Sequence, residues 1–120
     1  MEKKTLVIGA SDNPSRYSYL AVQRLRKNNH PVVAIGKRRT HVGDINVEEE
    51  KKPFTGIDTV TLYINPAHQK EYYNYILSLK PKRIIFNPGA ENEELADLAK
   101  KNDIQPVEAC TLVMLATGQY

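Results

Sequence analysis

The sequence contains few of the features that mark special classes of protein. It has 120 residues, a single cysteine, no tryptophan, and no apolar run near the roughly 20 residues that a membrane-spanning helix needs. One cysteine cannot form an internal disulfide, which excludes a disulfide-stabilised scaffold. Six glycines and seven prolines are an average share, so collagen-like and low-complexity chains are excluded as well. We expect one domain over residues 1–120, built around one ordinary hydrophobic core.

Targeting signals and a strong charge are also missing. Only a few apolar residues separate the start, Met1-Glu2-Lys3-Lys4, from the polar Ser11, which is too short a stretch for the apolar region of a signal peptide. The 17 Lys and Arg residues against 14 Asp and Glu leave a net charge of +3, which does not by itself indicate nucleic-acid binding. We therefore expect a cytoplasmic protein that binds neither nucleic acid nor membrane.

The sequence does contain an alternation of two patterns. Short runs rich in Val, Ile, Thr and Tyr predict five strands, and stretches with helical apolar spacing predict helices between them. The predicted strands are 5–9, 31–36, 59–64, 83–86 and 105–107, and the predicted helices are 19–28, 67–79 and 92–101. Runs such as Leu6-Val7-Ile8 are apolar throughout, which is typical of parallel strands buried on both faces.

This alternation predicts an α/β fold, a doubly wound parallel sheet of five strands in the order 3-2-1-4-5. Segment 40–56 fits a helix poorly, because Gly43, Pro53 and the charge run at 48–52 interrupt it. We expect a surface excursion there in place of the second crossover helix, with a short extended piece at 44–47.

Ligands of open parallel sheets bind outside the carboxyl ends of the strands. The candidate binding residues are therefore those that follow the predicted strands. They are Gly9, Ala10, Ser11, Asn13, Pro14, Ser15 and Arg16 after the first strand, Gly36, Lys37 and Arg38 after the second, Asn65 and Pro66 after the third, and Pro88 and Gly89 after the fourth.

The first of these loops suits an anion. It leads from Gly9 into a helix whose free N–H groups and positive dipole end attract phosphates, and Arg16 adds a forked donor. The full dinucleotide fingerprint is missing, because Ser11 stands where a second glycine is expected. A glycine that only permits a tight strand-to-helix turn is the alternative interpretation of Gly9.

The second loop is basic. Lys37, Arg38 and Arg39 stand where NAD-binding domains commonly place an acidic residue for the ribose hydroxyls. Cations favour a phosphorylated ribose instead, and arginine can hold a phosphate through two donors. A solvated basic turn is the alternative, but beside an anion-binding first loop the pattern favours a phosphorylated adenosine.

Two stretches resemble a known family. Gly-Ala-Ser-Asp-Asn-Pro-Ser-Arg-Tyr-Ser-Tyr at 9–19 and Asn-Pro-Gly-Ala-Glu-Asn-Glu-Glu at 87–94 are similar to the stand-alone CoA-binding domains, and so to the N-terminal domain of the succinyl-CoA synthetase alpha subunit. The resemblance covers nearly the whole chain. It implies a Rossmann-like domain that binds coenzyme A, with the pyrophosphate against residues 9–16 and the adenosine phosphate near the basic turn.

The resemblance carries over to single residues only in part. The family often has Asn-Pro-Lys after its second strand, where this chain has Ile35-Gly36-Lys37, so only Lys37 transfers directly. Asn65 and its neighbours would border the adenine. After the last strand the family tends to have Arg-Cys, and this chain has Ala109-Cys110.

No catalytic set is evident in the sequence. His30, His41 and His68 are scattered, so we expect ordinary surface or capping roles, and neither they nor the lone Cys110 form a metal-ligand pattern. For Cys110 we expect a buried, inert thiol, with a mixed disulfide to CoA as the alternative. Glu91, Glu93 and Glu94 are expected to complement a helix N-terminus that Asn92 caps.

The sequence thus predicts non-catalytic binding of coenzyme A or acyl-CoA, by a sensor or by a module that serves a protein partner or works as a homodimer. The leading alternative is an NADP-binding oxidoreductase-like domain, against which the missing second glycine argues. A structural domain whose pocket binds nothing is a third possibility.

Overall fold

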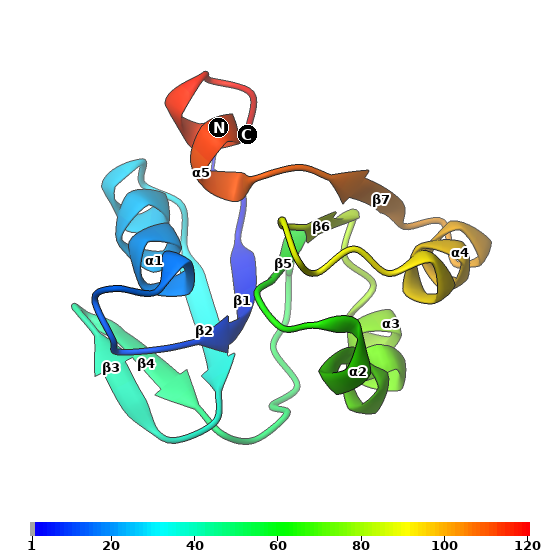
Figure 1. The fold of residues 1–120 in the computed structure, drawn as a ribbon, viewed down its shortest axis with the longest axis horizontal. Helices are drawn as coiled ribbons and strands as arrows, with labels where there is room; N and C mark the ends of the chain where they lie inside the picture. Colours follow the sequence, from blue (N-terminus) through cyan, green and yellow to red (C-terminus); the bar gives the residue numbers. More distant parts are fainter. Residues whose placement is uncertain (1) are drawn as a thin grey trace.

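Seven strands form one mixed sheet in the computed structural model, which describes residues 2–120 (Figure 1). The strands are β1 (Thr5–Ala10), β2 (Val32–Gly36), β3 (Thr40–Val42), β4 (Ile45–Glu48), β5 (Thr59–Leu62), β6 (Arg83–Phe86) and β7 (Gln105–Glu108). The helices are α1 (Tyr17–Lys27), α2 (Pro66–Gln69), the 3₁₀ turn η1 (Lys70–Tyr72), α3 (Tyr73–Leu79), α4 (Glu93–Lys101) and α5 (Thr111–Ala116). The strands lie in the order β3-β4-β2-β1-β5-β6-β7.

The observed sheet corrects the predicted strand number and order. The five predicted strands are β1, β2, β5, β6 and β7, and they lie in the order β2-β1-β5-β6-β7, so the order 3-2-1-4-5 is wrong for them. The cause is the excursion at 40–56. Its two strands form an antiparallel hairpin, and β4 pairs with β2 in parallel through Ala34 and Val47. Because β4 occupies that edge of β2, β5 pairs with the other side of β1.

Helices α1 and α4 lie where the sequence predicts helices, whereas the middle and the end of the chain differ from the prediction. The single helix predicted at 67–79 is three pieces, in which η1 separates α2 from α3. Helix α4 begins as predicted, because the Asn92 side chain accepts a hydrogen bond from the Leu95 N–H at 3.2 Å, with Glu93 and Glu94 in the first turn. A further helix, α5, begins directly after Cys110.

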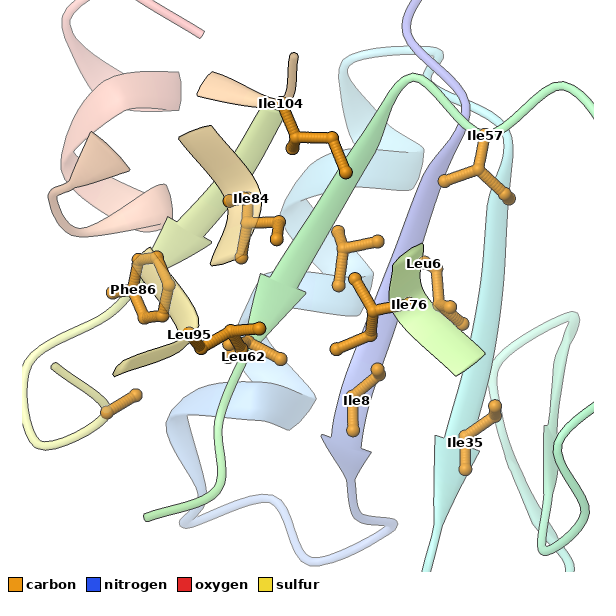
Figure 2. Packing of buried hydrophobic residues seen from close by; sticks show 13 residues of the cluster. Leu6, Ile8, Ile35, Ile57, Leu62, Ile76, Ile84, Phe86, Leu95 and Ile104 are labelled. Atoms are coloured by element: carbon orange, nitrogen blue, oxygen red, sulfur yellow. The ribbon is translucent and has the colours of Figure 1, made fainter. Parts of the chain in front are cut away.

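Helices cover the sheet on both faces. In Figure 1, α1 and α5 lie on one side of the strands and α3 and α4 on the other. Successive side chains of β1 point to opposite faces, so Leu6 and Ile8 pack with Ile76 of α3, whereas Val7 packs with Leu25 of α1. The larger of the two clusters is shown in Figure 2. All three β1 residues are 0% exposed, which confirms a strand buried on both faces.

The two ends of the described chain meet beside the amino end of β1, away from the strand ends where a ligand is expected. The Tyr120 hydroxyl lies 2.6 Å from the Thr5 hydroxyl, and its ring lies 4.9 Å from that of His30. The Nδ1 atom of His30 accepts a hydrogen bond from the Lys3 N–H at 3.0 Å. Burial and the nearby positive charge of Lys3 lower the pKa of His30, so the neutral imidazole belongs to the folded state.

Candidate functional site

A cleft of about 740 Å³ lies at the carboxyl ends of the central strands. Four connections line it: the β1–α1 loop, the β2–β3 turn, the β5–α2 loop and the β6–α4 loop. Strand β1 is flanked by β2 on one side and by β5 on the other. The chain leaves β2 and β5 for opposite edges of the sheet, which opens a crevice at this point, as expected for a doubly wound sheet.

The floor of the cleft is closely packed backbone. Gly9 has a φ of +93°, and a Cβ atom on it would lie 2.8 Å from the carbonyl oxygen of Tyr63 and 2.8 Å from a methyl carbon of Ile64. A Cβ atom on Gly36 would lie 2.3 Å from the carbonyl oxygen of Ala10. Side chains at either position would force apart the ends of β1, β2 and β5. Both glycines are therefore required by the approach of the strand ends, and Gly9 by its conformation as well.

The β1–α1 loop is held by its own hydrogen bonds. The Asn13 side-chain oxygen accepts from the backbone N–H of Ser15 at 3.0 Å and from its hydroxyl at 2.8 Å, and the Asn13 N–H donates to the Ser11 hydroxyl at 3.1 Å. Arg16 is the N-cap of α1, and its side chain makes no capping hydrogen bond within residues 2–120. The loop thus delivers the uncapped, positive end of an eleven-residue helix to the cleft, where an anion is stabilised.

Three cationic side chains converge on the same cleft. Arg16 comes from the first loop, and Lys37 and Arg38 come from the β2–β3 turn. The Arg38 guanidinium donates to the Asp12 carboxylate at 2.9 Å, so this ion pair joins the basic turn directly to the first loop. The two stretches that the sequence predicted to form one binding surface therefore face each other.

Asp12 is the single carboxylate among the described residues that line the cleft. Its second oxygen accepts a hydrogen bond from the Thr40 hydroxyl at 2.7 Å. The hydrogen bond from Thr40, and after it the one from Arg38, holds the pKa of Asp12 below its usual range. Asp12 is therefore ionised at neutral pH and holds one cation of the cleft.

The opposite wall of the cleft is fixed by a buried glutamine. Gln69 is 0% exposed, and its side-chain amide donates to the carbonyl oxygen of Ile64 at 2.9 Å and to that of Ala90 at 2.8 Å. Its side-chain oxygen accepts from Asn92 at 2.8 Å. Ile64 and Ala90 both line the cleft, so Gln69 sets the distance between the β5–α2 and β6–α4 loops.

A second buried network lies beneath this wall. The Asn87 side chain donates to the Thr61 hydroxyl at 2.6 Å and accepts from the Thr111 N–H at 2.9 Å, which ties the end of β6 to β5 and to α5. Tyr63 reaches the cleft from the end of β5, and its buried hydroxyl has no hydrogen-bond partner within residues 2–120. Burial raises the pKa of Tyr63, so the ring is neutral at physiological pH.

Most of the residues predicted from the strand ends line this cleft. They are Gly9, Ala10, Ser11, Ser15, Arg16, Lys37, Arg38, Asn65, Pro88 and Gly89. Four predicted residues do not line it: Asn13, Pro14, Gly36 and Pro66. Asn13 holds the β1–α1 loop and Gly36 permits the close approach of the strand ends, as described above, and Pro66 is the first residue of α2, behind the N-cap Asn65.

Several residues that line the cleft are not among the candidates named from the strand ends. They are Asp12, Tyr17, Ser18, Thr40, Tyr63, Ile64, His68 and Ala90. Of these, Asp12 lies within the stretch 9–16 that the resemblance places against the pyrophosphate, and Ile64 is the neighbour of Asn65 that it places beside the adenine. His68, expected to have an ordinary surface or capping role, lies in the first turn of α2, where its N–H is capped by the Asn65 side chain at 3.1 Å, and it also borders the cleft. The sequence could have indicated that His68 lies near the cleft, because it stands three residues after Asn65 in a helix that starts there. Asp12 and Thr40 carried no such signal, because their pairing depends on the approach of two distant loops.

Cys110 does not line the cleft. It is the N-cap residue of the short helix α5 and is half-buried. Within residues 2–120 no three His, Cys, Asp or Glu side chains are grouped closely enough to hold a metal ion. None of the helices in that range has both the length and the apolar character needed to cross a membrane.

Comparison with known proteins identifies the kind of domain. A family model described as a CoA binding domain matches residues 3–116. A solved structure described only as an uncharacterized protein shares 50% sequence identity and a TM-score of 0.97, and the match covers 100% of this chain and 99% of the other. Among curated proteins there is no significant match.

More distant structures share the fold. A protein from Thermus thermophilus is 20% identical with a TM-score of 0.83, over 99% of this chain and 91% of that one. A hypothetical protein from Pyrococcus horikoshii OT3 is also 20% identical, with a TM-score of 0.87 over 97% and 83% of the two chains. These likenesses show that the overall fold of this chain occurs in other proteins.

Proposed function

Because the chain belongs to the CoA-binding domain family, we propose that it binds coenzyme A or an acyl-CoA in the cleft at the carboxyl ends of the central strands. One observation supports this most strongly. The Asp12–Arg38 ion pair brings the basic turn against the loop that begins at Gly9, so that the cations and the uncapped helix end share one cleft. A ligand with phosphates at two separate places suits such a surface.

The charges suggest how the ligand lies. The pyrophosphate would lie over the first loop, where Gly9 lets the backbone approach closely and the α1 end and Arg16 supply positive charge. The 3′-phosphate of the adenosine would lie at Lys37 and Arg38, and the adenine would border Ile64 and Asn65. Coenzyme A contributes an acyl-carrying thiol, and the residues named here bind and orient the carrier.

We propose that the protein is a binding module without a reaction of its own. Of the three histidines only His68 lines the cleft, whereas His30 lies beside Tyr120 and His41 is exposed on β3. A sensor of CoA or acyl-CoA, or a subunit that presents the ligand to a protein partner or to a second copy of this chain, suits this composition.

Calorimetric titration with CoA and with NADPH tests this proposal against an NADP-binding domain. Both ligands carry a phosphorylated adenosine and a pyrophosphate, so the basic turn alone does not separate them. Ser11 occupies the place where a dinucleotide fingerprint has its second glycine, and we expect CoA to bind clearly more tightly than NADPH. Tighter binding of NADPH, or no binding of either ligand, would contradict the proposal. Incubation with acetyl-CoA should release no free CoA thiol above the rate without protein.

A further inference from the structure

The carboxylate of Asp12 accepts a hydrogen bond from the Arg38 guanidinium, which is a donor that a bound phosphate would also use. Its Oδ1 atom accepts from Nη2 of Arg38 at 2.9 Å, and both residues line the cleft. Among the described residues, the other charged or titratable side chains that line it are Arg16, Lys37, His68, Tyr17 and Tyr63. A carboxylate among these groups repels an incoming phosphate and competes with it for the guanidinium.

We propose that Asp12 is a specificity-determining residue, which competes with the 3′-phosphate of the ligand for Arg38 and so sets how strongly the cleft prefers the phosphorylated form. The inference rests on the proposed function, because it takes the ligand to be a CoA. It adds a role for a residue that opposes binding, in a cleft otherwise lined with groups that favour it.

The exposure of the two side chains makes this exchange feasible. The Arg38 side chain is 71% exposed and that of Asp12 is 35% exposed, so Arg38 can turn from carboxylate to phosphate without opening the core. An exposed ion pair of this kind is weak, so a doubly charged phosphate can displace it.

Thr40 keeps the loops together while Arg38 moves. Its hydroxyl donates to the Oδ2 atom of Asp12 at 2.7 Å, independently of the arginine. Once Arg38 leaves, the basic turn is still joined to the first loop through this hydrogen bond. Asp12→Asn retains an oxygen that can accept the hydrogen bond from Thr40 but removes the negative charge. The variant therefore tests the competition for Arg38 without removing the hydrogen bond that holds the loop.

The chain offers a matched control. Asp44 also forms an exposed ion pair with an arginine, since its Oδ2 atom lies 2.9 Å from Nη2 of Arg26, and it does not line the cleft. Asp44→Asn therefore makes the same change in net charge and breaks a similar pair elsewhere. Any effect of overall charge on a polyanionic ligand appears in both variants.

The test is calorimetric titration of the wild type, Asp12→Asn and Asp44→Asn with CoA and dephospho-CoA. We expect Asp12→Asn to bind CoA about three- to tenfold more tightly, from the release of an exposed ion pair and of like-charge repulsion. Its affinity for dephospho-CoA and both affinities of Asp44→Asn should stay within about twofold of the wild type. An unchanged or weaker affinity of Asp12→Asn for CoA overturns the inference, and so does an equal gain for both ligands.

Two further measurements keep this result separate from the proposed function. In an Arg38→Gln background, Asp12→Asn should lose most of its gain in affinity for CoA. A full gain in that background would show that the overall charge, and not competition for Arg38, determines the affinity. If the wild type binds neither form of CoA, the proposed function fails, and adenosine 3′-phosphate decides the inference. Tighter binding of adenosine 3′-phosphate by Asp12→Asn than by the wild type and Asp44→Asn supports the competition, and equal binding overturns it.

Discussion

Replacing Gln69 by leucine should both destabilise the fold and weaken the cleft. The two side chains are similar in size, so the change leaves little empty space and removes mainly hydrogen bonds. Gln69 is fully buried and donates to the carbonyl oxygens of Ile64 and Ala90, while Asn92 donates to it. In Gln69→Leu each of these three partners loses a hydrogen bond; the one to Ala90 is buried and the other two are part-buried.

The size of the effect follows from those contacts. A net hydrogen bond contributes about 0.5–1.5 kcal/mol, and a buried group left without a partner costs about 1–3 kcal/mol. Allowing for partial relaxation of the exposed part of Asn92, we expect the free energy of unfolding to fall by about 2–5 kcal/mol. A domain of this size typically has about 5–15 kcal/mol of stability, so the variant should still fold.

Urea denaturation of Gln69→Leu beside Gln23→Leu measures this. Gln23 is exposed on α1, so its replacement makes the same chemical change without breaking a buried hydrogen bond. The control should stay within about 0.5 kcal/mol of the wild type. A loss below about 1 kcal/mol for Gln69→Leu would refute the role assigned to the buried amide. The variant should also bind CoA more weakly, because the Ile64 and Ala90 loops are no longer held at a fixed distance.

Three more predictions concern single positions. Gly9→Ala should destabilise the protein by about 2 kcal/mol or more, because its φ is +93° and its Cβ would meet backbone, whereas Gly56→Ala, with a φ of +67° and open space around it, should cost less in the same denaturation assay. Tyr63→Phe should leave stability unchanged or raise it by about 1 kcal/mol, since it removes a buried hydroxyl that has no partner among the described residues; a clear loss would reveal a missing partner. Because burial lowers the pKa of His30 in the folded state, stability should be full above the unfolded value of about 6.5 and fall as the pH drops below it, and His30→Gln should flatten that fall in denaturation curves at pH 7.5 and 5.5.

The strands could be predicted because their sequences fit few other kinds of secondary structure. Runs such as Leu6-Val7-Ile8 are short, branched and wholly apolar, which suits only a strand covered on both faces. The order of the strands could not be predicted in the same way. The order depends on whether the β3–β4 hairpin pairs with the free edge of β2. The two strands of that hairpin have three and four residues, which is too short and too polar to give a clear strand pattern in the sequence.

The break between α2 and α3 shows a related limit. Residues 70–72 contain neither glycine nor proline to signal an interruption, yet they form a 3₁₀ turn. The turn lies next to Gln69, whose side chain points into the protein to hold two loops. A glutamine in a helical pattern gives no indication of such a role, because its partners are two backbone groups 5 and 21 residues away and the side chain of Asn92.

The site was predictable where position in the chain decides it and not where tertiary contact does. Residues that follow a strand within a few positions, such as Lys37 and Asn65, reach the cleft because the carboxyl ends of parallel strands share one edge. Asp12 was passed over because its role appears only when Arg38, 26 residues away, turns toward it. The cation-rich turn was predicted from charge, but the carboxylate that opposes it required the structure.

The central claim is that the basic turn and the loop after β1 together hold a ligand with a phosphorylated adenosine. Its most direct test is the affinity of the wild type and of Lys37→Ala for CoA and for dephospho-CoA, measured by calorimetry under one salt condition. We expect CoA to bind more tightly than dephospho-CoA, and Lys37→Ala to weaken CoA binding by about 1.5–3 kcal/mol while the affinity for dephospho-CoA barely changes. Equal wild-type affinity for the two ligands, or an equal loss for both in Lys37→Ala, would contradict it.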